Sequence, residues 1–369
     1  MYVRYYCERS QAPEDREKMK IMAGEAFIHH ASLSRRALLA GTAAGAVGLT
    51  VGSPFGAARA QAASFVNGAD ASWAQQMTAT GYTWKNASGT TENLFTILAG
   101  YGIGAIRLRT WVNPSDDPVN GNCDINETAQ MAVLAKAAGM SVLIDYHFGD
   151  TWNSVGVQNP PAAWADMTYA EMLQAMYNYV YDTMEILKYN HVSPEWVQIG
   201  NEINSGICWP IGGLNYPTQM TGLLNAAYDM VKEVSPDSQV LIHLAQPQDY
   251  SSLEAFFSAY SANGGQWDMS VFSSYGSASE APGIAANMAE IAAAYDKPFM
   301  QVEFGGPVAN PGSTESALET YISSLKSHGG LGIFYWEPEV YAPFDTWDET
   351  AWNASTLEPT VIMNGFTAG

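Results

Sequence analysis

The feature that most constrains the fold of this chain is a regular alternation of short apolar runs with helical patterns. Eight apolar runs of strand length follow the first 62 residues, and seven helical patterns lie between them. The expected strands cover 65–70, 104–111, 140–147, 196–202, 239–244, 269–275, 298–304 and 331–337. The expected helices cover 92–99, 125–138, 167–189, 215–234, 252–260, 282–295 and 314–328. This alternation predicts an α/β protein with a single-domain (β/α)8 TIM barrel.

The alternative for such a pattern is an open, doubly wound sheet. That fold carries a glycine-rich phosphate-binding loop after its first strand, and Asn67-Gly68-Ala69-Asp70 does not have this form. The sequence shows no internal repeat, linker or second domain. We therefore expect residues 63–369 to form one barrel, with its functional side chains at the C-terminal ends of the strands.

Residues 1–62 have a different character. Arg35 and Arg36 precede a weakly apolar run of alanine and glycine that extends to Val51, and small-x-small cleavage sites follow at 58–62. This pattern predicts a twin-arginine export signal, with an N-terminal extension before it for which Met22 is an alternative start. A membrane anchor is the other interpretation, but the apolar run is too short for one. We expect a secreted or periplasmic protein that is free of the membrane after cleavage.

Removal of this segment leaves a strongly acidic chain. The first 60 residues contain eight of the 16 Lys and Arg residues and five of the 37 acidic residues, so 8 basic and 32 acidic residues remain. Such a surface would repel nucleic acid, anionic lipid and a polyanionic polysaccharide. We therefore expect a neutral polysaccharide as the partner, no nucleic acid, and a monomeric protein.

The mature chain would contain only two cysteines, Cys123 and Cys208. Both lie just past expected strands, so the sequence leaves open whether they form a disulfide or two free thiols. Two distant cysteines without nearby histidines do not have the spacing of a zinc site. No metal or other cofactor is expected.

Titratable and aromatic side chains concentrate where the expected strands end. Glu202 ends the fourth strand and Glu303 lies near the end of the seventh. Two carboxyl groups delivered in this way match the pair that a glycosidase places on either side of the scissile bond. The other residues at strand ends are Asp70, Arg107, Arg109, Trp111, Asp145, His147, Asp150, Trp152, Asn201, His243, Tyr275, Trp336 and Glu337.

Arg107 and Arg109 are the only arginines after residue 62. They lie two apart on one strand, so their side chains point the same way. If that face is the barrel interior, each needs a carboxylate partner, because an unpaired buried charge is very unfavourable. One arginine would then keep a nucleophilic carboxylate ionised, while the other holds the acidic side chains in position. The alternative is a purely structural ion pair with Asp70 or Asp145.

Several motifs resemble those of glycoside hydrolase family 53, the endo-β-1,4-galactanases that cut type I arabinogalactan. The resemblance extends from about Phe65 to Phe366 and includes long, unusual motifs. They are Phe65-x-Asn-Gly-Ala-Asp70, Ile106-Arg-Leu-Arg-Thr-Trp-Val-Asn113-Pro114, Leu143-Ile-Asp-Tyr-His147-Phe-Gly-Asp150-Thr-Trp152, Gln158-Asn-Pro-Pro-Ala-Ala-Trp164, Val197-Gln-Ile-Gly-Asn-Glu-Ile-Asn204 and Gly332-Ile-Phe-Tyr-Trp-Glu337-Pro338.

The resemblance implies a retaining hydrolase on a (β/α)8 barrel, with catalytic glutamates on the fourth and seventh strands. Glu202 would be the acid/base and Glu303 the nucleophile. Glu303 needs a cationic or hydrogen-bonding partner to stay ionised, and an arginine of the second strand and Tyr275 are the candidates. Glu202 needs an apolar or anionic setting to keep its proton. Asn201 fits the donor to the sugar 2-hydroxyl.

Other residues are expected to bind substrate. Asp145 and His147 match an Asp-x-His motif of the family, although His147 could instead be a core histidine. His243 is equally compatible with a site or a core position. Indole rings stack on the apolar faces of sugars. The candidate platforms are Trp152, Trp164, Trp209 and Trp336, of which Trp336 is favoured because it ends the eighth strand.

Two loops depart from the family pattern. Many members have Tyr-Tyr-Pro after the sixth strand, where this chain has Ser274-Tyr275-Gly276, so the subsites shaped by this loop are expected to differ. Bacterial relatives often bind calcium in the loop after the seventh strand, but residues 305–312 contain no carboxylate and we predict no site there. Asp345, Asp348 and Glu349 are a weaker alternative for calcium.

Two other functions remain open. The first is another retaining enzyme of the same barrel type, such as a β-mannanase, a glucanase or an arabinofuranosidase. The second is a non-catalytic polysaccharide-binding barrel, although such a protein has no reason to keep both glutamates, Asn201 and the two arginines.

Overall fold

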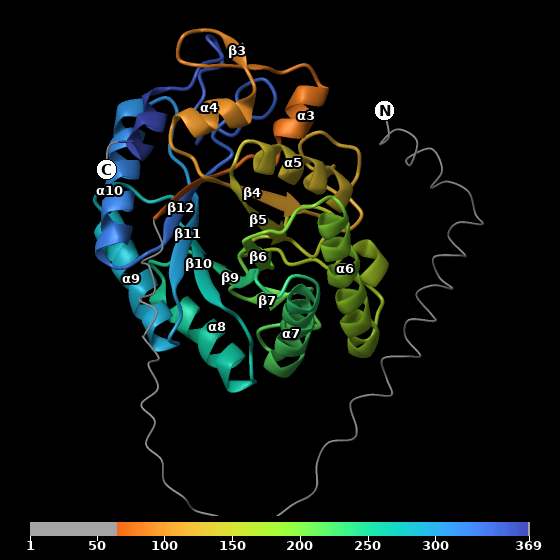
Figure 1. Ribbon diagram of the computed structural model, residues 1–369. Coiled ribbons are helices and arrows are strands. Elements are labelled where there is room, and N and C mark those ends of the chain that lie inside the picture. The colour runs from red at the N-terminus through yellow and green to blue at the C-terminus, as the bar shows by residue number, and fades with distance from the viewer. Residues whose placement is uncertain (1–64, 368–369) are drawn as a thin grey trace, which may run out of the picture. The chain divides into compact units, whose positions relative to one another are not determined.

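Eight parallel strands close into a barrel in the part of the chain that the computed structural model describes, residues 65–367. This confirms the predicted (β/α)8 architecture, whereas the predicted extension and export signal lie outside the described residues. The strands follow one another around the barrel in the order β1-β12-β11-β10-β9-β6-β5-β4 (Figure 1). Their bounds are β1 Val66–Asp70, β4 Ala105–Thr110, β5 Ser141–Tyr146, β6 Trp196–Ile199, β9 Gln239–Ala245, β10 Met269–Ser273, β11 Phe299–Phe304 and β12 Gly332–Trp336.

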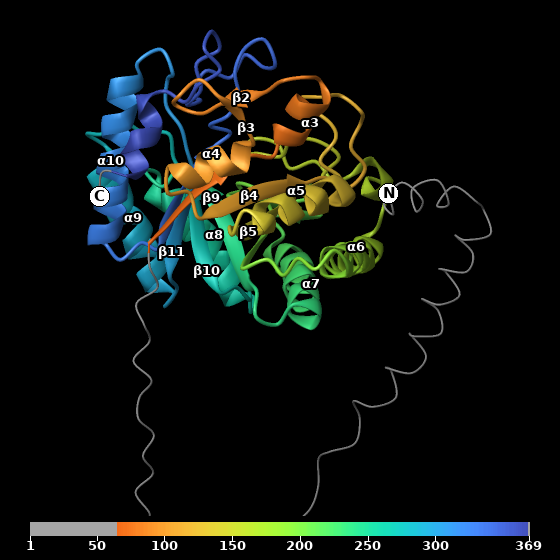
Figure 2. The same cartoon turned by 45° about the horizontal axis from the view of Figure 1, so that its top comes forward.

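The helices surround the barrel, with α6 beside α7 and α9 beside α10 (Figures 1 and 2). They are α3 Ala74–Ala79, α4 Leu94–Gly100, α5 Ile125–Ala137, α6 Tyr169–Tyr189, α7 Pro217–Val234, α8 Tyr250–Ala262, α9 Ala281–Ala294 and α10 Pro311–Ser327. Two 3-10 helices, η1 Ala162–Trp164 and η2 Val361–Phe366, and two small hairpins complete the described fold. The hairpins pair β2 Trp84–Lys85 with β3 Thr91–Glu92 and β7 Gly206–Ile207 with β8 Gly212–Gly213. The sequence had not indicated α3 or the hairpins.

Local sequence explains where the helices begin. Asp124 and Glu127 form a capping box at the start of α5, in which each side chain accepts a hydrogen bond from the other residue's backbone N–H. Thr168 and Glu171 form the same arrangement at the start of α6. These caps satisfy backbone donors that a helix leaves unpaired. They therefore fix the positions at which the loops after β4 and β5 pass into helices.

Alternation along the strands separates the barrel interior from the helix-facing layer. On β4, Ile106 and Leu108 pack toward the helices, while Ala105, Arg107 and Arg109 belong to the interior. The lower interior is apolar and tightly filled. It is made of Ala105, Leu143, Leu241, Met269, Val271, Met300, Val302 and Phe334.

One glycine makes this filling possible. A Cβ atom on Gly68 of β1 would lie 2.2 Å from the ring of Phe334, so only glycine leaves room for that ring. The polar groups of the site stand on this apolar layer. They follow at the next inward positions of the strands, toward the C-terminal ends.

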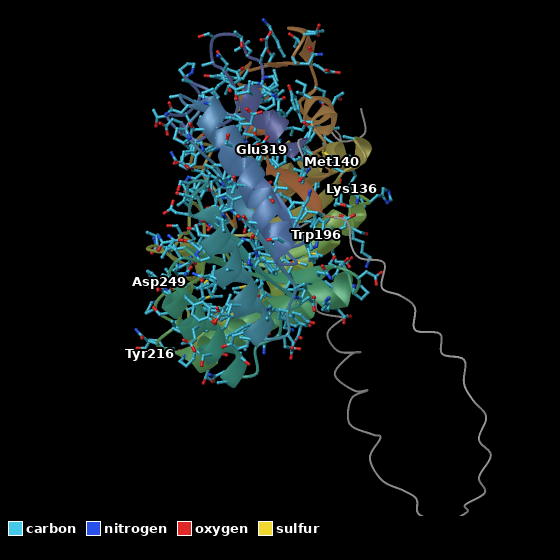
Figure 3. The ribbon with its side chains drawn as sticks, turned by 90° about the vertical axis from the view of Figure 1, so that its left-hand side faces the viewer. Lys136, Met140, Trp196, Tyr216, Asp249 and Glu319 are labelled. Carbon is cyan, nitrogen blue, oxygen red and sulfur yellow. The ribbon has the colours of Figure 1, made fainter. Side chains whose placement is uncertain are left out.

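The two ends of the barrel carry different residues (Figure 3). Met140 precedes β5 and Trp196 begins β6, and both lie on one side of this view. Tyr216 and Asp249 precede α7 and α8 and lie on the other side. The barrel axis therefore runs across the view, with the C-terminal ends of the strands facing the side of Tyr216 and Asp249.

Two predicted strands extend two or more residues past their observed ends. β6 ends at Ile199 rather than at residue 202, and β10 ends at Ser273 rather than at residue 275. After β6 the backbone turns through left-handed conformations, with φ +105° at Gly200 and +49° at Glu202. An extended strand cannot continue through such angles. Glu202 therefore projects from a turn above the barrel.

The described cysteines are two free, buried thiols. The sulfur of Cys123 lies 3.6 Å from the carbonyl oxygen of Ser72, and that of Cys208 lies 3.8 Å from the carbonyl oxygen of Phe148. The disulfide alternative is therefore wrong. Burial raises the pKa of each thiol to about 12, so both stay protonated.

Within residues 65–367, no helix is both long and apolar enough to cross a membrane.

Candidate active site

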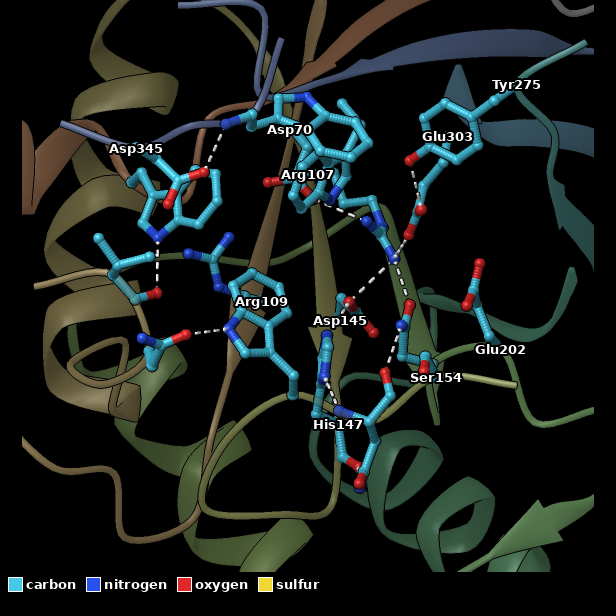
Figure 4. Close-up of a pocket in the computed structure, with 18 residues that line it drawn as sticks. Asp70, Arg107, Arg109, Asp145, His147, Ser154, Glu202, Tyr275, Glu303 and Asp345 are labelled. Atoms are coloured by element: carbon cyan, nitrogen blue, oxygen red, sulfur yellow. Dashed lines mark hydrogen bonds and ion pairs between the residues drawn. The ribbon is translucent and has the colours of Figure 1, made fainter. Parts of the chain in front are cut away.

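A cavity of about 430 Å³ opens at the C-terminal ends of the barrel strands. Both predicted catalytic glutamates line it, and Arg107 and Glu303 lie between Arg109 on one side and Glu202 on the other (Figure 4). Eight of the predicted substrate-binding residues also line it. They are Asn201, Arg107, Arg109, Asp145, His147, Trp152, Tyr275 and Trp336.

Arg107 is the centre of the polar network. Its guanidinium lies 2.7 Å from Asp70, 2.9 Å from Asp145 and 2.9 Å from Glu303, and its side chain is 1% exposed. It also donates to the side-chain oxygen of Asn201 at 2.9 Å. Arg107 thus makes both the contact expected for a nucleophile's partner and the structural ion pairs that were the alternative. Burial lowers its pKa, but the surrounding carboxylates outweigh this effect and keep it charged.

Glu303 has the two partners predicted for it. One carboxyl oxygen contacts Arg107, and the other accepts a hydrogen bond of 2.9 Å from the Tyr275 hydroxyl. Burial raises the pKa of Tyr275 well above its usual value, so this hydroxyl remains a donor. Burial also raises the pKa of Glu303 to about 8, against the opposing effect of Arg107, and the charge of Glu202 adds to the rise. Arg107 and Tyr275 orient Glu303, but the effect of Arg107 on its pKa is smaller than the opposing effect of burial.

Glu202 lies in a different environment. It is half-buried, and one carboxyl oxygen accepts a hydrogen bond of 2.6 Å from the hydroxyl of Ser273, the last residue of β10. The sequence predicted an apolar or anionic environment for Glu202. The structure provides an anionic neighbour, Glu303, but also a polar contact with Ser273. The two carboxyls lie close enough for the charge on Glu202 to raise the pKa of Glu303.

Asn201 is held by its neighbours on three sides. Its side-chain oxygen accepts from Arg107, and its amide nitrogen donates to the carbonyl oxygen of Asn153 at 2.9 Å. Gln158 donates to its backbone carbonyl at 2.7 Å. The second hydrogen of the amide nitrogen is free to reach the cavity that Asn201 lines.

His243 does not line the cavity, which decides between the two predicted positions in favour of the core. It is fully buried, and burial, reinforced by Arg107, lowers its pKa well below the usual range. Its Nδ1 atom lies 3.0 Å from the side-chain oxygen of Asn201 and 3.3 Å from the backbone nitrogen of Glu202. A neutral ring in this place orients the Asn-Glu pair from below rather than contacting substrate.

His147 reaches the cavity from the end of β5. Its Nε2 lies 3.0 Å from Asp145, and its Nδ1 accepts from the backbone nitrogen of Asn153 at 3.3 Å. Burial raises the pKa of Asp145, but Arg107 and His147 outweigh this effect and lower it. Asp145 is therefore a fixed charge that links the imidazole to the central arginine.

Tryptophans form the wall beside Arg109. The guanidinium carbon of Arg109 lies 4.9 Å from the ring centroid of Trp73 and 4.5 Å from that of Trp152. Trp336 contacts both rings edge-on, at 5.3 and 6.0 Å, and Trp347 lies 4.8 Å from Trp336. These four indoles line the cavity. Such a wall suits the flat apolar faces of sugar rings.

Comparison with known proteins adds the family to this geometry. The model of glycosyl hydrolase family 53 matches residues 66–319. The arabinogalactan endo-beta-1,4-galactanase A of Aspergillus niger is 30% identical over 286 residues, which cover 70% of this chain and 80% of that protein. The chain belongs to glycosyl hydrolase family 53.

Solved structures agree with the family 53 assignment. The family 53 catalytic domain of Ignisphaera aggregans has a TM-score of 0.75 and 28% identity, covering 82% of this chain and 95% of that one. A structure from a study of two fungal beta-1,4-galactanases has a TM-score of 0.74 and 26% identity, covering 82% and 99%. The chain is therefore a glycoside hydrolase, and the expectation of a family 53 enzyme is confirmed.

This family 53 chain also contains a buried pair of carboxyls after β12. Glu337 and Glu339 are both fully buried. Glu337 pairs with Arg109 and accepts the backbone N–H of Trp73 at 3.2 Å. Among residues 65–367, no N–H or hydroxyl group of another residue donates to either oxygen of Glu339, whose carboxyl interacts with that of Glu337. Such a contact is favourable only when a proton lies between the two groups.

Burial sets the pH dependence of this pair. It raises the pKa of Glu339 well above its usual value, and the charge of Glu337 adds to the rise. Burial likewise raises the pKa of Glu337 to about 7, against the effect of Arg109. One positive charge on Arg109 balances one carboxylate. Above about pH 7, and until the raised pKa of Glu339 is reached, the pair therefore holds one proton in the folded enzyme.

Replacing Glu339 with glutamine should remove one source of alkaline instability. The folded protein keeps the proton, whereas the unfolded chain loses it above about pH 4.3, so unfolding releases a proton. The wild-type free energy of unfolding should thus fall, relative to the variant, by about 1.4 kcal/mol per pH unit until the raised pKa is reached. Thermal melts from pH 5 to pH 9 would measure this difference.

The control is Glu319→Gln, which changes an exposed carboxyl on the outer face of α10 in the same way (Figure 3). Its melting temperature should follow that of the wild type at every pH. A constant offset between Glu339→Gln and the wild type across the pH range would mean that Glu339 is ionised in the fold, contrary to the shared proton.

Some of the predicted platforms lie elsewhere. Trp164 is buried against Tyr179 and Trp209 is half-buried, and neither lines the cavity. Sequence reasoning also missed cavity-lining residues, namely Trp73, Asn120, Asn153, Ser154 and Trp347. Trp73 offered a signal, because a tryptophan three residues beyond Asp70 follows the end of the first strand. Trp347 gave none, since it lies eleven residues beyond β12 in an irregular loop.

No cluster of three or more potential metal ligands occurs between residues 65 and 367. Asp345, part of the weaker calcium alternative, instead lines the cavity and accepts the backbone N–H of Trp347 at 2.7 Å.

Proposed function

We propose that the chain is an exported, retaining endo-β-1,4-galactanase that hydrolyses the galactan of type I arabinogalactan, with Glu303 as nucleophile and Glu202 as acid/base. The observation that carries the two roles is the pairing of Glu303 with both Arg107 and Tyr275, while Glu202 lies across the same cavity. Membership of family 53 and the galactanase activity named for its relatives support the substrate.

Because burial raises the pKa of Glu303 to about 8, the reactive form of the enzyme is the one in which this carboxyl has lost its proton. In the first step, a carboxylate oxygen of Glu303 attacks the anomeric carbon of the bound sugar. The glycosidic bond breaks, and Glu202 gives its proton to the departing oxygen. Arg107 and Tyr275 hold Glu303 by both of its oxygens, so the carboxylate needs no reorientation before the attack. The products are a covalent glycosyl-enzyme and a free chain end.

In the second step, Glu202 accepts a proton from a water molecule as that water attacks the same carbon. The ester bond to Glu303 breaks and its electron pair returns to the carboxylate. Esterification removes the charge of Glu303, one of the groups near Glu202, so the environment of the acid/base changes between the two steps. Two inversions at one carbon give overall retention.

The rest of the cavity positions the sugar. The free amide hydrogen of Asn201 is the proposed donor to the 2-hydroxyl, and Trp336 is the proposed stacking platform. Arg109 supports the tryptophan wall from behind, with its guanidinium carbon 4.5 Å from the ring centroid of Trp152. The lining contains no lysine and five carboxyl groups, on Asp70, Asp145, Glu202, Glu303 and Asp345, so the cavity favours an uncharged sugar over an anionic one.

The test is the release of reducing ends by purified protein from lupin or potato β-1,4-galactan, with mannan, carboxymethylcellulose and arabinan alongside. We expect activity on galactan with short oligosaccharide products, and proton NMR should show the β-anomer forming first. Activity mainly on mannan or cellulose would overturn the substrate. An α-anomer as first product would overturn the retaining mechanism, and binding without cleavage would favour a polysaccharide-binding barrel.

The export proposal rests on Arg35 and Arg36, which lie outside the described residues. Changing both to lysine keeps the charge but should block passage through a twin-arginine pathway. The precursor should then accumulate inside the producing cell, whereas the wild type appears outside the cytoplasm with a new N-terminus near residue 62. Equal export of both proteins would contradict the proposal.

A further inference from the structure

A second cavity, of about 360 Å³, adjoins the candidate active site on the side of Glu202. The two cavities share only Glu202 and Tyr275 in their linings. The second lies over the end of β9 at Ala245, the end of β10 at Ser273, and the residue before α9, Glu280. Glu202 therefore stands between two cavities, while Glu303 lines only the first.

The two cavities differ in their chemistry. The first has four tryptophans in its lining, whereas the second has none, and Tyr275 is its single aromatic residue. Amide and carboxyl side chains take their place, on Gln246, Gln248 and Glu280. Neither glutamine side chain makes a hydrogen bond to another part of residues 65–367, and both are exposed. Their donors and acceptors are therefore available to a ligand.

The backbone fixes where these amides stand. Gln246 follows β9 directly with φ +57°, a conformation that is unusual for a residue other than glycine. Its N–H donates to the carbonyl oxygen of Ser273 at 3.1 Å, which anchors the turn to β10. The hydroxyl of that same serine holds Glu202. The acid/base and the glutamine turn are thus fastened to one residue.

Small residues keep the cavity open after β10. Ser274 is buried, with its hydroxyl 3.3 Å from that of Tyr321, and Gly276 has no room for a side chain, because a Cβ would lie 2.4 Å from the Tyr321 hydroxyl. These are the positions where the sequence Ser274-Tyr275-Gly276 departs from the family pattern. The residues that depart from the family pattern thus form part of the lining of the second cavity, next to Glu202.

We infer that this second cavity is the leaving-group subsite of the enzyme, and that it binds one uncharged sugar through the amide side chains of Gln246 and Gln248 rather than by stacking. The inference rests on the proposed function. In a retaining hydrolase the attacked sugar lies at the nucleophile and the departing sugar lies at the acid. The attacked sugar and those before it then occupy the tryptophan-lined cavity, and the departing sugar occupies the polar one.

Recognition is therefore unequal on the two sides of the scissile bond. Hydrogen bonds at a solvent-exposed subsite exchange with hydrogen bonds to water, so each adds little net affinity. Burial of sugar faces against four indoles adds more. The substrate is held chiefly by the part that becomes the glycosyl-enzyme, and the departing part leaves readily. The carboxylate of Glu280 would also reject a uronate at this subsite.

The experiment compares the double variant Gln246→Ala/Gln248→Ala with the wild type on two substrates. One is β-1,4-galactan, which places a sugar in the second cavity, and the other is 4-nitrophenyl β-1,4-galactobioside, whose leaving group offers no hydroxyls. We expect kcat/KM on galactan to fall about 10-fold, a loss of two modest hydrogen bonds, and the ratio of galactan to aryl glycoside rates to fall nearly as much. Cleavage of reducing-end-labelled galactotetraose should shift toward other bonds.

The matched control is Gln174→Ala, an exposed glutamine on the outer surface of α6, which should leave both rates and the cleavage pattern unchanged. Equal losses on the two substrates would overturn the inference, because the glutamines would then affect the chemistry in general. No loss on galactan would overturn it as well. If the wild type itself does not cleave galactan but cleaves another glycan, the proposed substrate fails, and the same comparison with that glycan tests the subsite independently.

Discussion

Replacing Glu303 with alanine should reduce the turnover of galactan by a factor on the order of 10⁴ or more. Among residues 65–367, no carboxyl other than that of Glu303 contacts both Arg107 and Tyr275, which hold the attacking oxygen in place. Without a nucleophile, no glycosyl-enzyme forms. Azide, a small anion that fits the vacated space, should restore part of the activity on an activated aryl glycoside. Its product should be the α-glycosyl azide, since a single displacement inverts the anomeric carbon.

The same substitution should not unfold the protein. Burial raises the pKa of Glu303 to about 8, so the fold loses an unfavourable burial when the carboxyl is removed. Arg107 keeps Asp70 and Asp145 as partners. We expect a melting temperature at neutral pH that equals or exceeds that of the wild type, as often occurs when a functional group is removed. Near-wild-type turnover by the folded variant, or a β-configured product with azide, would contradict the nucleophile role.

Replacing Glu202 with alanine should give the second largest effect, and one that depends on the leaving group. Proton donation by a positioned acid typically contributes 10²–10⁴-fold, and galactan needs it because a sugar alkoxide is a poor leaving group. A dinitrophenyl glycoside does not need it in the first step. We expect galactan turnover to fall by about 10³-fold. The formation of the glycosyl-enzyme from the aryl substrate should fall far less.

Pre-steady-state measurements separate the two steps for this variant. The aryl substrate should give a burst of released phenol followed by slow turnover, because the second step lacks its base. The matched control is Ser273→Ala, which keeps Glu202 but removes its hydrogen bond of 2.6 Å. It should show a smaller loss on both substrates. Equal losses of galactan and aryl glycoside cleavage in Glu202→Ala would assign the acid role to another residue.

Much of the fold and of the site could be predicted because both depend on local patterns. The strands are runs of buried residues at regular spacing, and each ends close to a polar residue such as Asp70 or Glu303. Since parallel barrel strands meet at one end, residues at their C-terminal ends had to converge. Arginine occurs only at positions 107 and 109 after residue 62, on one face of one strand. This likewise indicated that both side chains have buried carboxylate partners.

The remaining features depend on loops and on burial that no periodicity reveals. The indole of Trp347 reaches the cavity only because the loop after β12 folds back over it. The complete burial of Glu339 cannot be read from its neighbours in the chain, where charged residues usually lie at the surface. His243 shows another limit of the sequence. Its place near a strand end was equally compatible with substrate contact and with the core, and the structure places the side chain beneath Asn201.

The two arginines of β4 have all of their carboxylate partners only when the last strands of the barrel are in place. Arg107 joins the first half of the chain to Glu303 of β11, and Arg109 joins it to Glu337 beyond β12. If the last two strands opened alone, Arg109 would lose its carboxylate inside a largely apolar shell. Partial opening of this kind is therefore disfavoured, and the first and last strands should exchange their amide hydrogens as one cooperative unit. The ion pairs that position the groups of the active site thus also make a partly open barrel unstable.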